Sequence, residues 1–268
     1  MTPLLDVVEV TKTYELETRL LPRLAGRRQP LTAVDDVSVS VPRGGVLGIV
    51  GESGCGKSTL ARMIMRLETP TAGRIWFAGQ DITALSGPAL TAVRKRMQMV
   101  FQDPGGSLNP RKPVRRVLWE SLSLAGAPRQ GRVAAAASLL DRVGLGTAML
   151  EHYPHELSGG QRQRVAIARA LAMSPDLIVA DEPVSALDVS LQAQIIRLLM
   201  RLRDELQLTL VFISHDLPLV HHFCSAVVVM QAGRVVERGT PAEVLHHPQH
   251  PYTRLLLDAI PRAPYRLA

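Results

Sequence analysis

The hydrophobic positions of the chain alternate between short continuous runs and longer stretches with helical spacing. The continuous runs at 46–50, 178–180 and 209–213 have the length and composition of strands that are buried on both faces. The stretches with helical spacing are 58–67, 165–171 and 191–206. In the first of them, Leu60, Ile64 and Leu67 fall on one face. This strand–helix–strand repetition predicts an α/β fold around a parallel, doubly wound sheet.

Three further regions depart from this alternation. The short apolar run 227–230 and the segment 233–237 that follows it are predicted to form a hairpin at the far side of the sheet. The region 103–163 contains four early prolines and a helical run at 132–143, which predicts an inserted helical subdomain. Residues 15–30 carry two prolines and four arginines, Arg19, Arg23, Arg27 and Arg28, and are predicted to form an exposed loop.

Composition limits the classes of protein to consider. The 268 residues are 46% hydrophobic but only 4% aromatic, so we expect a mainly aliphatic core. The net charge is +7, yet aromatic residues are not interleaved with the basic ones as in single-strand binders, and we expect solvated basic faces and no nucleic acid. Two distant cysteines, Cys55 and Cys224, favour a reducing compartment over a disulfide framework. No apolar run approaches the ~18 residues that would span a bilayer, so any transport channel would come from other chains.

A complete phosphate-binding motif, G-x-x-x-x-G-K-S, follows the first predicted strand. It consists of Gly51, Glu52, Ser53, Gly54, Cys55, Gly56, Lys57 and Ser58. Glycines allow the backbone N–H groups of such a loop to turn toward an anion, and the next helix presents its N-terminus to the same anion. We expect Lys57 to meet the β- and γ-phosphates and the Ser58 hydroxyl to meet Mg²⁺. The motif alone does not separate kinases, GTPases and transport ATPases.

Two carboxylates, Asp181 and Glu182, follow the apolar run at 178–180. The carboxyl edge of a parallel sheet is where ligands bind, so Asp181 is a candidate Mg²⁺ ligand. Glu182, next to it, is a candidate general base for the water that attacks the γ-phosphate. The alternative is that both carboxylates only solvate the end of a strand; Pro183 and the preceding apolar residues argue against it.

A second anion-binding helix start is predicted between these two motifs. It consists of Leu157, Ser158, Gly159, Gly160 and Gln161, with Ser158 as the helix cap. With the phosphate loop before it and the carboxylates after it, the chain resembles the ATP-binding subunits of ABC transporters over nearly its whole length. The resemblance implies one domain, 1–268, with an N-terminal antiparallel β subdomain. Its core would cover about 1–102 and 164–245, the helical subdomain about 103–163 and a C-terminal extension about 246–268.

The resemblance also implies a role for each motif. Glu182 would be the catalytic base, His215 the switch histidine at the γ-phosphate, and Lys57 a catalytic cation. Ser185, Ala186, Leu187 and Asp188 would form the D-loop that crosses a dimer interface. The residues expected to bind ATP are Tyr14, Gly51, Glu52, Ser53, Gly54, Cys55, Gly56, Lys57, Ser58, Thr59, Gln102 and Asp181; those expected at Mg²⁺ are Ser58, Gln102 and Asp181. Tyr14 would stack on adenine, with a core aromatic as the alternative.

Partners follow from the same resemblance. Residues Leu157–Gln161, the signature of the family, would cap the γ-phosphate held by an opposite subunit, so that a head-to-tail pair holds two ATP molecules. We expect the opposite subunit to be a paralogous ATPase, with two transmembrane permeases and, indirectly, an extracytoplasmic substrate-binding protein. The chain would lie peripherally on the cytoplasmic face of the membrane. The segment 102–116, with Arg111, Lys112, Arg115 and Arg116, would contact the permeases.

Within the family, 51–56, 107–112, 181–189 and 250–253 resemble the peptide/nickel importer branch, and most of all the F-type ATPase of dipeptide or oligopeptide importers. A cysteine-rich tail of that branch is not matched here, so no iron–sulfur cluster is expected. Nickel or metal-chelate cargo remains an alternative to peptides. A soluble ABC ATPase that does not transport, or a phosphate-loop kinase, would be a different class. Finally, Cys55 at a helix N-terminus predicts a reactive thiolate whose alkylation blocks ATP binding.

Overall fold

A six-stranded sheet with the order β10-β9-β3-β8-β7-β6 forms the centre of the computed structural model, which describes residues 2–15, 30–102, 104–221 and 223–259. Its strands are β3 (Val46–Val50), β6 (Met97–Val100), β7 (Leu177–Asp181), β8 (Thr209–Ser214), β9 (Ala226–Gln231) and β10 (Arg234–Gly239). All neighbours pair in parallel except β9 and β10, which form an antiparallel hairpin. The predicted strands and the hairpin are therefore confirmed.

Successive side chains along the central strands point to opposite faces of the sheet and belong to two separate apolar clusters. On β8, Phe212 belongs to a cluster on the helical face, whereas Val211 and Ile213 face a second cluster on the opposite side. Every residue of β3, β7 and β8 is buried, which explains why these strands have apolar runs without polar alternation. Strands covered on both faces bring their carboxyl ends together at one protected edge.

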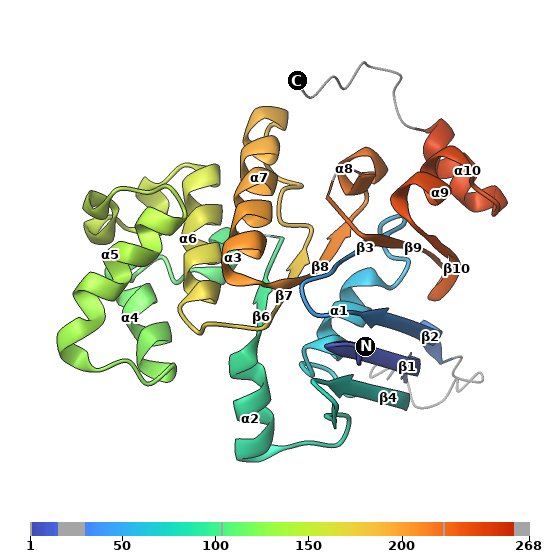
Figure 1. Cartoon of the computed structure of the whole chain (residues 1–268), viewed down its shortest axis with the longest axis horizontal. Helices are drawn as coiled ribbons and strands as arrows, with labels where there is room; N and C mark the ends of the chain where they lie inside the picture. The colour runs from blue at the N-terminus through green and yellow to red at the C-terminus, as the bar shows by residue number, and fades with distance from the viewer. Residues whose placement is uncertain (1, 16–29, 103, 222, 260–268) are drawn as a thin grey trace, which may run out of the picture.

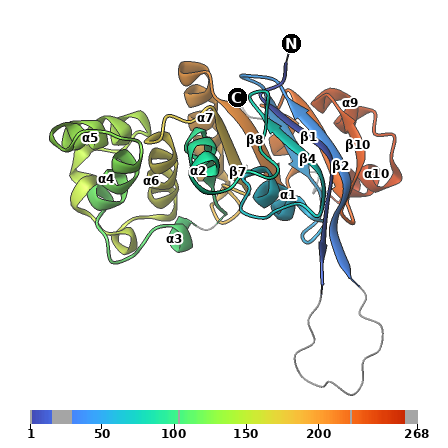
Figure 2. The ribbon, with the colours of Figure 1, turned by 90° about the horizontal axis from the view of Figure 1, so that it is seen from below.

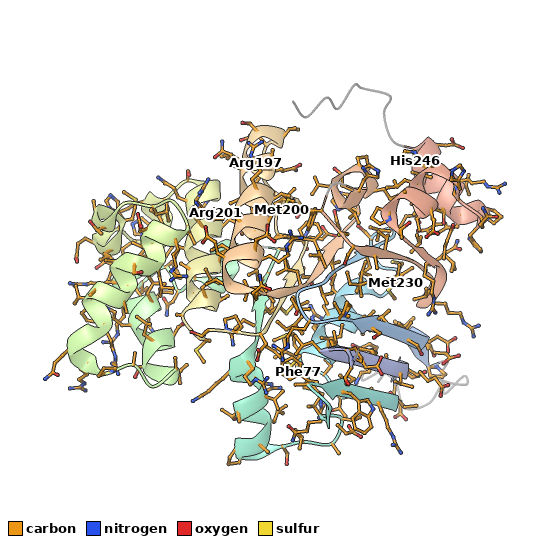
Figure 3. The ribbon with its side chains drawn as sticks, viewed as in Figure 1. Phe77, Arg197, Met200, Arg201, Met230 and His246 are labelled. Carbon is orange, nitrogen blue, oxygen red and sulfur yellow. The ribbon has the colours of Figure 1, made fainter. Side chains whose placement is uncertain are left out.

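A second, antiparallel sheet lies beside the central one and has the order β2-β1-β4-β5. Its strands are β1 (Leu5–Tyr14), β2 (Leu31–Val41), β4 (Ala72–Phe77) and β5 (Gln80–Asp81). Helix α1 (Lys57–Ile64) contributes Leu60, Met63 and Ile64 to the apolar cluster shared with this sheet. Phe77 and Met230, labelled in Figure 3, belong to the same cluster. The predicted α/β fold with an N-terminal antiparallel subdomain is confirmed.

Helices cover the other face of the central sheet and extend away from it (Figures 1 and 2). They are α3 (Pro104–Ser107), α4 (Val114–Leu124), α5 (Arg132–Arg142), α6 (Gly159–Leu171), α7 (Val189–Leu206), α8 (Leu217–His221), α9 (Pro241–His246) and α10 (Pro251–Asp258). Short 3₁₀ turns lie at Arg129–Gly131, Thr147–Glu151 and Pro154–Glu156, and α2 (Gly87–Arg96) precedes β6. Helices α4, α5 and α6 pack together at one end of the molecule (Figure 1). The proposed subdomain limits at 103 and 163 stay a prediction.

One helix is shorter than predicted. We expected it to reach Leu67, but α1 ends at Ile64 because Arg66 adopts a left-handed backbone with φ of 53°. Leu67 is consequently 50% exposed and does not share the buried face of Leu60 and Ile64. Most of the loop predicted at 15–30, including its four arginines, lies outside the described residues.

The structure also bears on two features considered from the sequence, disulfides and membrane-spanning segments. Cys55 and Cys224 are both free and buried, and no disulfide joins them. Among the helices that the structure describes, not one combines the length and the apolar character needed to cross a bilayer.

Candidate functional site

The phosphate loop connects β3 to α1 and is packed tightly against neighbouring backbone. A Cβ on Gly51 would lie 2.3 Å from the Met230 carbonyl oxygen, and one on Gly56 would lie 2.3 Å from the Ala33 carbonyl oxygen. Both glycines also have positive φ, 152° and 106°. A side chain at either position would displace the loop, so glycine is required here for space as well as for conformation.

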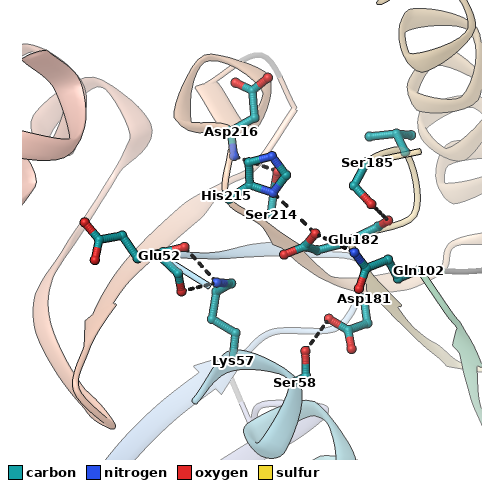
Figure 4. A network of polar contacts seen from close by, with 12 residues as sticks. Glu52, Lys57, Ser58, Gln102, Asp181, Glu182, Ser185, Ser214, His215 and Asp216 are labelled. Atoms are coloured by element: carbon teal, nitrogen blue, oxygen red, sulfur yellow. Dashed lines mark hydrogen bonds and ion pairs between the residues drawn. The ribbon is translucent and has the colours of Figure 1, made fainter. Parts of the chain in front are cut away.

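Lys57 begins α1 and folds back over the loop (Figure 4). Its ammonium donates hydrogen bonds of 2.7 Å to the carbonyl oxygens of Gly51 and Glu52. The residue is only 4% exposed. A buried ammonium held at the mouth of a loop of backbone N–H groups suits a polyphosphate.

Ser58 and Asp181 bring two oxygen donors together beside the loop. The Ser58 hydroxyl donates to Asp181 Oδ1 over 3.1 Å. Burial raises the pKa of Asp181; the hydrogen bond from Ser58 opposes this shift, and the negative charge of Glu182 adds to it. A buried carboxylate without a positive partner is unfavourable, so Asp181 would be stabilised by a cation. Mg²⁺ prefers oxygen ligands, and the Asp181 carboxylate and the Ser58 hydroxyl supply them.

Glu182 joins the ends of three neighbouring strands. It follows β7, its backbone N–H donates to the carbonyl of Ile213 on β8, and its φ of 46° turns the chain away from the sheet. Its carboxylate accepts a hydrogen bond of 3.2 Å from Gln102 Nε2 and lies 3.3 Å from His215 Nδ1. The structure therefore brings together three residues that are far apart in sequence (Figure 4).

The surroundings of Glu182 leave room for a small reactant. Its side chain is 12% exposed, whereas that of His215 is 54% exposed. A cavity of ≈ 20 Å³ beside them is lined by Glu182, Val184, Ser185, Gln192, Ser214, His215, Asp216 and Leu219. This is about the space that one water requires. A carboxylate next to a polar cavity of this size can accept a proton from a water molecule there.

The signature residues form a capped helix start on α6. The Ser158 hydroxyl accepts from the Gln161 N–H, and Gln161 Oε1 accepts from the Ser158 N–H. Leu157 is buried below this cap. In Figure 1, strands β6 and β7 lie between α6 and α1, so the signature is separated from the phosphate loop of its own chain.

The expected D-loop packs directly on the signature. A Cβ on Gly159 would lie 3.2 Å from Leu187, and one on Gly160 would lie 3.2 Å from Leu191. Ser185 turns the chain by donating to the Glu182 carbonyl, and the Asp188 carboxylate caps α7 by accepting from the Leu191 N–H. Ala186 lies between them. The D-loop thus connects Glu182 to the signature helix through short local contacts.

Tyr14 lies at the end of β1 and has partners of its own. Its hydroxyl donates to the Glu68 carboxylate, and the Lys12 ammonium lies 5.1 Å from its ring centroid. Burial, then the hydrogen bond to Glu68, raises the pKa of the phenol. The ring is half-buried, so stacking on adenine remains a prediction.

The prediction of a reactive thiolate at Cys55 was wrong. The side chain is buried, and this desolvation raises the pKa of the thiol despite the opposing charge of Lys57. Helix position lowers a thiol pKa only where the anion stays solvated or is well paired. Lys57 donates its two short hydrogen bonds to the carbonyl oxygens of Gly51 and Glu52, and burial has the larger effect on the pKa of Cys55.

Sequence reasoning missed two contacts of the phosphate loop. The Glu52 N–H donates to the phenol oxygen of Tyr252, and the Gly233 N–H donates to the Cys55 carbonyl oxygen. These groups lie about 180 to 200 residues further along the chain. The only signal was the 250–253 stretch, which identified a branch of a family but indicated no contact.

Comparisons with known proteins agree with this geometry. A family model described as "ABC transporter" matches residues 34–185, and one described as "Oligopeptide/dipeptide transporter, C-terminal region" matches 236–267. The chain is 46% identical to the dipeptide transport ATP-binding protein DppF of Escherichia coli, covering 97% of this chain and 77% of that protein. It is 49% identical to the oligopeptide transport ATP-binding protein AppF of Bacillus subtilis, covering 96% and 78%.

Solved structures resemble the whole fold. The chain matches cbiO1 of Clostridium perfringens, part of the transporter complex cbiONQ, with a TM-score of 0.77, 30% identity and 92% coverage of both chains. It also matches the dimeric cassette MJ0796 bound to ADP and phosphate, with a TM-score of 0.75 and 30% identity, covering 88% of this chain and 98% of that one.

Proposed function

The chain belongs to the ABC transporter family, and we propose that it hydrolyses ATP to power the import of dipeptides or oligopeptides through partner permeases. The observation that carries the hydrolytic part is the meeting of Gln102, Glu182 and His215 beside Lys57, Ser58 and Asp181. A nucleotide-binding protein without turnover would not need a carboxylate at the strand end after Asp181.

The residues divide the work of hydrolysis. The loop amides and Lys57 bind and orient the β- and γ-phosphates. Ser58 and Asp181 would hold Mg²⁺, with Gln102 close by, and the bound ion would neutralise charge on the phosphates. Glu182 accepts a proton from the attacking water. At the same time the water oxygen bonds to the γ-phosphorus, and the bond between that phosphorus and the ADP oxygen breaks. His215, whose Nδ1 lies 3.3 Å from the Glu182 carboxylate, would orient Glu182 and contact the γ-phosphate.

A single chain holds only half of each site in this proposal. Its signature, Leu157–Gln161, is separated from its own phosphate loop and would complete the site of an opposite subunit. The dimeric form of MJ0796 supports such a pair. We propose that the opposite subunit is a paralogous ATPase and that the pair lies on the cytoplasmic face of the membrane under two permeases. An extracytoplasmic binding protein would deliver the peptide.

Peptides are the proposed cargo because the names of DppF and AppF, and the model matching 236–267, concern dipeptides and oligopeptides. These names and descriptions do not mention nickel. With Cys55 and Cys224 as its two cysteines, the sequence offers too few thiolates for an iron–sulfur cluster, and we propose that it holds none.

Reconstitution tests the proposal. The chain is co-expressed with candidate permeases and a candidate paralogous ATPase from the same genome. The membranes are then solubilised, and the complex is captured through a tag on a permease. We expect co-capture of this chain and ATPase activity that rises with peptide-loaded binding protein. ATPase activity that stays in the soluble fraction and does not change when the permeases are present would favour a non-transport ATPase. Stimulation by nickel alone would reassign the cargo.

A further inference from the structure

A tyrosine near the end of the described chain touches the phosphate loop. Tyr252, on the first turn of α10, is only 6% exposed, and its phenol oxygen accepts the Glu52 N–H over 3.0 Å. Glu52 is the second residue of the loop. The contact joins the region matched as an importer C-terminal segment to the nucleotide-binding motif.

The position of Tyr252 is set by hydrogen bonds at the start of α10. The Glu237 carboxylate, on β10, accepts the backbone N–H groups of Gln249 and His250 over 2.8 and 3.1 Å. Partial burial acts to raise the pKa of Glu237, but the hydrogen bonds that it accepts outweigh burial and hold the pKa below its usual range. The His250 ring then accepts the Tyr252 N–H over 3.2 Å. An ionised carboxylate thus holds α10 on the hairpin.

Residue Glu52 is held from two sides. Tyr252 receives its N–H, and the Lys57 ammonium donates to its carbonyl oxygen over 2.7 Å. The same carbonyl accepts the Cys55 N–H over 3.3 Å, closing the turn of the loop. The Glu52 N–H shares a peptide group with the Gly51 carbonyl, which also accepts from Lys57 over 2.7 Å, so movement of Tyr252 would free a peptide group that positions this lysine.

We propose that Tyr252 is a positioning residue of the ATP site, which holds the phosphate loop in its binding conformation through the Glu52 N–H. The proposal rests on ATP being the ligand of this loop. A loop that is already ordered before binding does not lose that conformational freedom when the nucleotide arrives. The C-terminal segment accordingly contributes to nucleotide affinity without touching the nucleotide.

If Tyr252 only anchored α10, its contribution would depend on the aromatic ring and not on the hydroxyl. Tyr252 belongs to the main apolar cluster, so its ring also anchors α10. Tyr252→Phe keeps that packing and removes only the acceptor for the Glu52 N–H. This substitution separates positioning from anchoring.

The test measures binding of a fluorescent, N-methylanthraniloyl-labelled ATP with Mg²⁺ to the purified full chain and to Tyr252→Phe. A hydrogen bond between neutral groups contributes about 0.5–1.5 kcal/mol, so we expect roughly two- to tenfold weaker binding. The thermal midpoint without nucleotide should stay close to that of the unaltered chain. Tyr153→Phe, which removes an exposed phenol before the signature, is the matched control and should bind normally.

Hydrogen exchange supplies the second readout. In the nucleotide-free chain, amides of 51–56 should exchange faster in Tyr252→Phe than in the unaltered chain or in Tyr153→Phe. Equal affinity of the Tyr252→Phe and unaltered chains would overturn the inference alone. So would weaker binding without faster exchange in 51–56, because the effect would then not run through the loop. An unaltered chain that does not bind ATP would overturn the proposed function, and this inference with it.

Discussion

At the scale of single residues, Glu182 has the most demanding position in the site. It combines a left-handed backbone with two side-chain partners, Gln102 and His215. Non-glycine residues in this conformation are uncommon and are often found at functional sites, where the surrounding structure holds them. The strain is compensated here by the Glu182 N–H bond to β8.

Glu182→Gln should therefore abolish turnover while preserving ATP affinity. The amide keeps the shape and the neighbours of the carboxylate but does not accept a proton, and general-base catalysis contributes typically 10²–10⁴-fold. Phosphate release by the assembled complex measures turnover, and the variant should accumulate an ATP-bound dimer. Glu205→Gln, at the exposed end of α7, is the control. Near-normal hydrolysis by Glu182→Gln would show that Glu182 is not the general base.

Cys55 should react slowly with alkylating reagents at neutral pH. Its raised pKa means that the thiolate is scarcer than in a free cysteine, and the rate should climb about tenfold per pH unit below that pKa. Mass spectrometry after timed exposure to iodoacetamide measures it, with Cys55→Ser identifying the site. Modified protein should lose ATP binding because the added group fills the loop, and prebound ATP should protect. Fast labelling at pH 7 would show that the thiol is less buried than its position indicates.

Residue identities were predictable wherever a motif carries its own chemistry. Lys57, Ser58, Asp181 and Glu182 belong to patterns that predict one shared ligand, and the structure brings these four residues together. The pKa of Cys55 was not predictable, because it depends on burial by segments distant in sequence. Tyr252 was missed for the same reason: its partner Glu52 lies 200 residues away.

At the scale of elements, the loop between β3 and α1 depends on close approach to other backbone. Gly56→Ala would place a methyl group against the Ala33 carbonyl at a φ of 106°. We expect it to destabilise the chain by about 1–3 kcal/mol and to abolish ATP binding, since the loop must shift. Thermal unfolding and nucleotide binding measure the two effects.

Gly131→Ala is the matched control for that substitution. Gly131 has open space at its Cβ position and a φ of −92°, so alanine should be tolerated. Equal stability of Gly56→Ala and Gly131→Ala would contradict the importance of the close approach to β2.

The elements themselves were predictable where periodicity was strong. Apolar runs marked β3, β7 and β8, because strands covered on both faces hold few polar residues. The end of α1 was not predictable from spacing, since the turn at Arg66 is stabilised by tertiary hydrogen bonds from its guanidinium to Ile82 and Leu85. The local pattern of hydrophobic residues therefore predicts which segments are buried, but it does not predict hydrogen bonds between distant residues.

At the scale of the whole molecule, the site is divided between chains in the proposed assembly. The purified chain alone should be a monomer or a weak dimer with slow ATPase activity, and it should gain activity when its paralogous partner and permeases are present. The predicted permease contact, 102–116, begins directly at Gln102, which touches Glu182. Motion of Gln102 would therefore reach Glu182, the proposed general base, through one hydrogen bond.

Two arginines on that segment offer the sharpest test of coupling. Arg115 pairs with Glu151 and Arg116 with Glu120, both as exposed ion pairs of 3.3 Å. Exposed pairs contribute about 0–1 kcal/mol, so reversing both charges should leave the fold and nucleotide binding intact. The charges lie on the proposed membrane-facing side, where a basic surface would favour anionic lipids and permease loops.

Arg115→Glu with Arg116→Glu should accordingly uncouple transport from ATP binding. Peptide uptake by reconstituted vesicles should fall strongly, while ATP affinity of the isolated chain stays unchanged. Glu205→Lys, which reverses a charge in an exposed pair with Arg201 on α7, is the control and should transport normally. Crosslinks from 102–116 to the permeases identify the contact directly. Crosslinks only to a second copy of this chain, together with full transport by that homodimer and its permeases, would refute both the permease contact and the heteromeric pair.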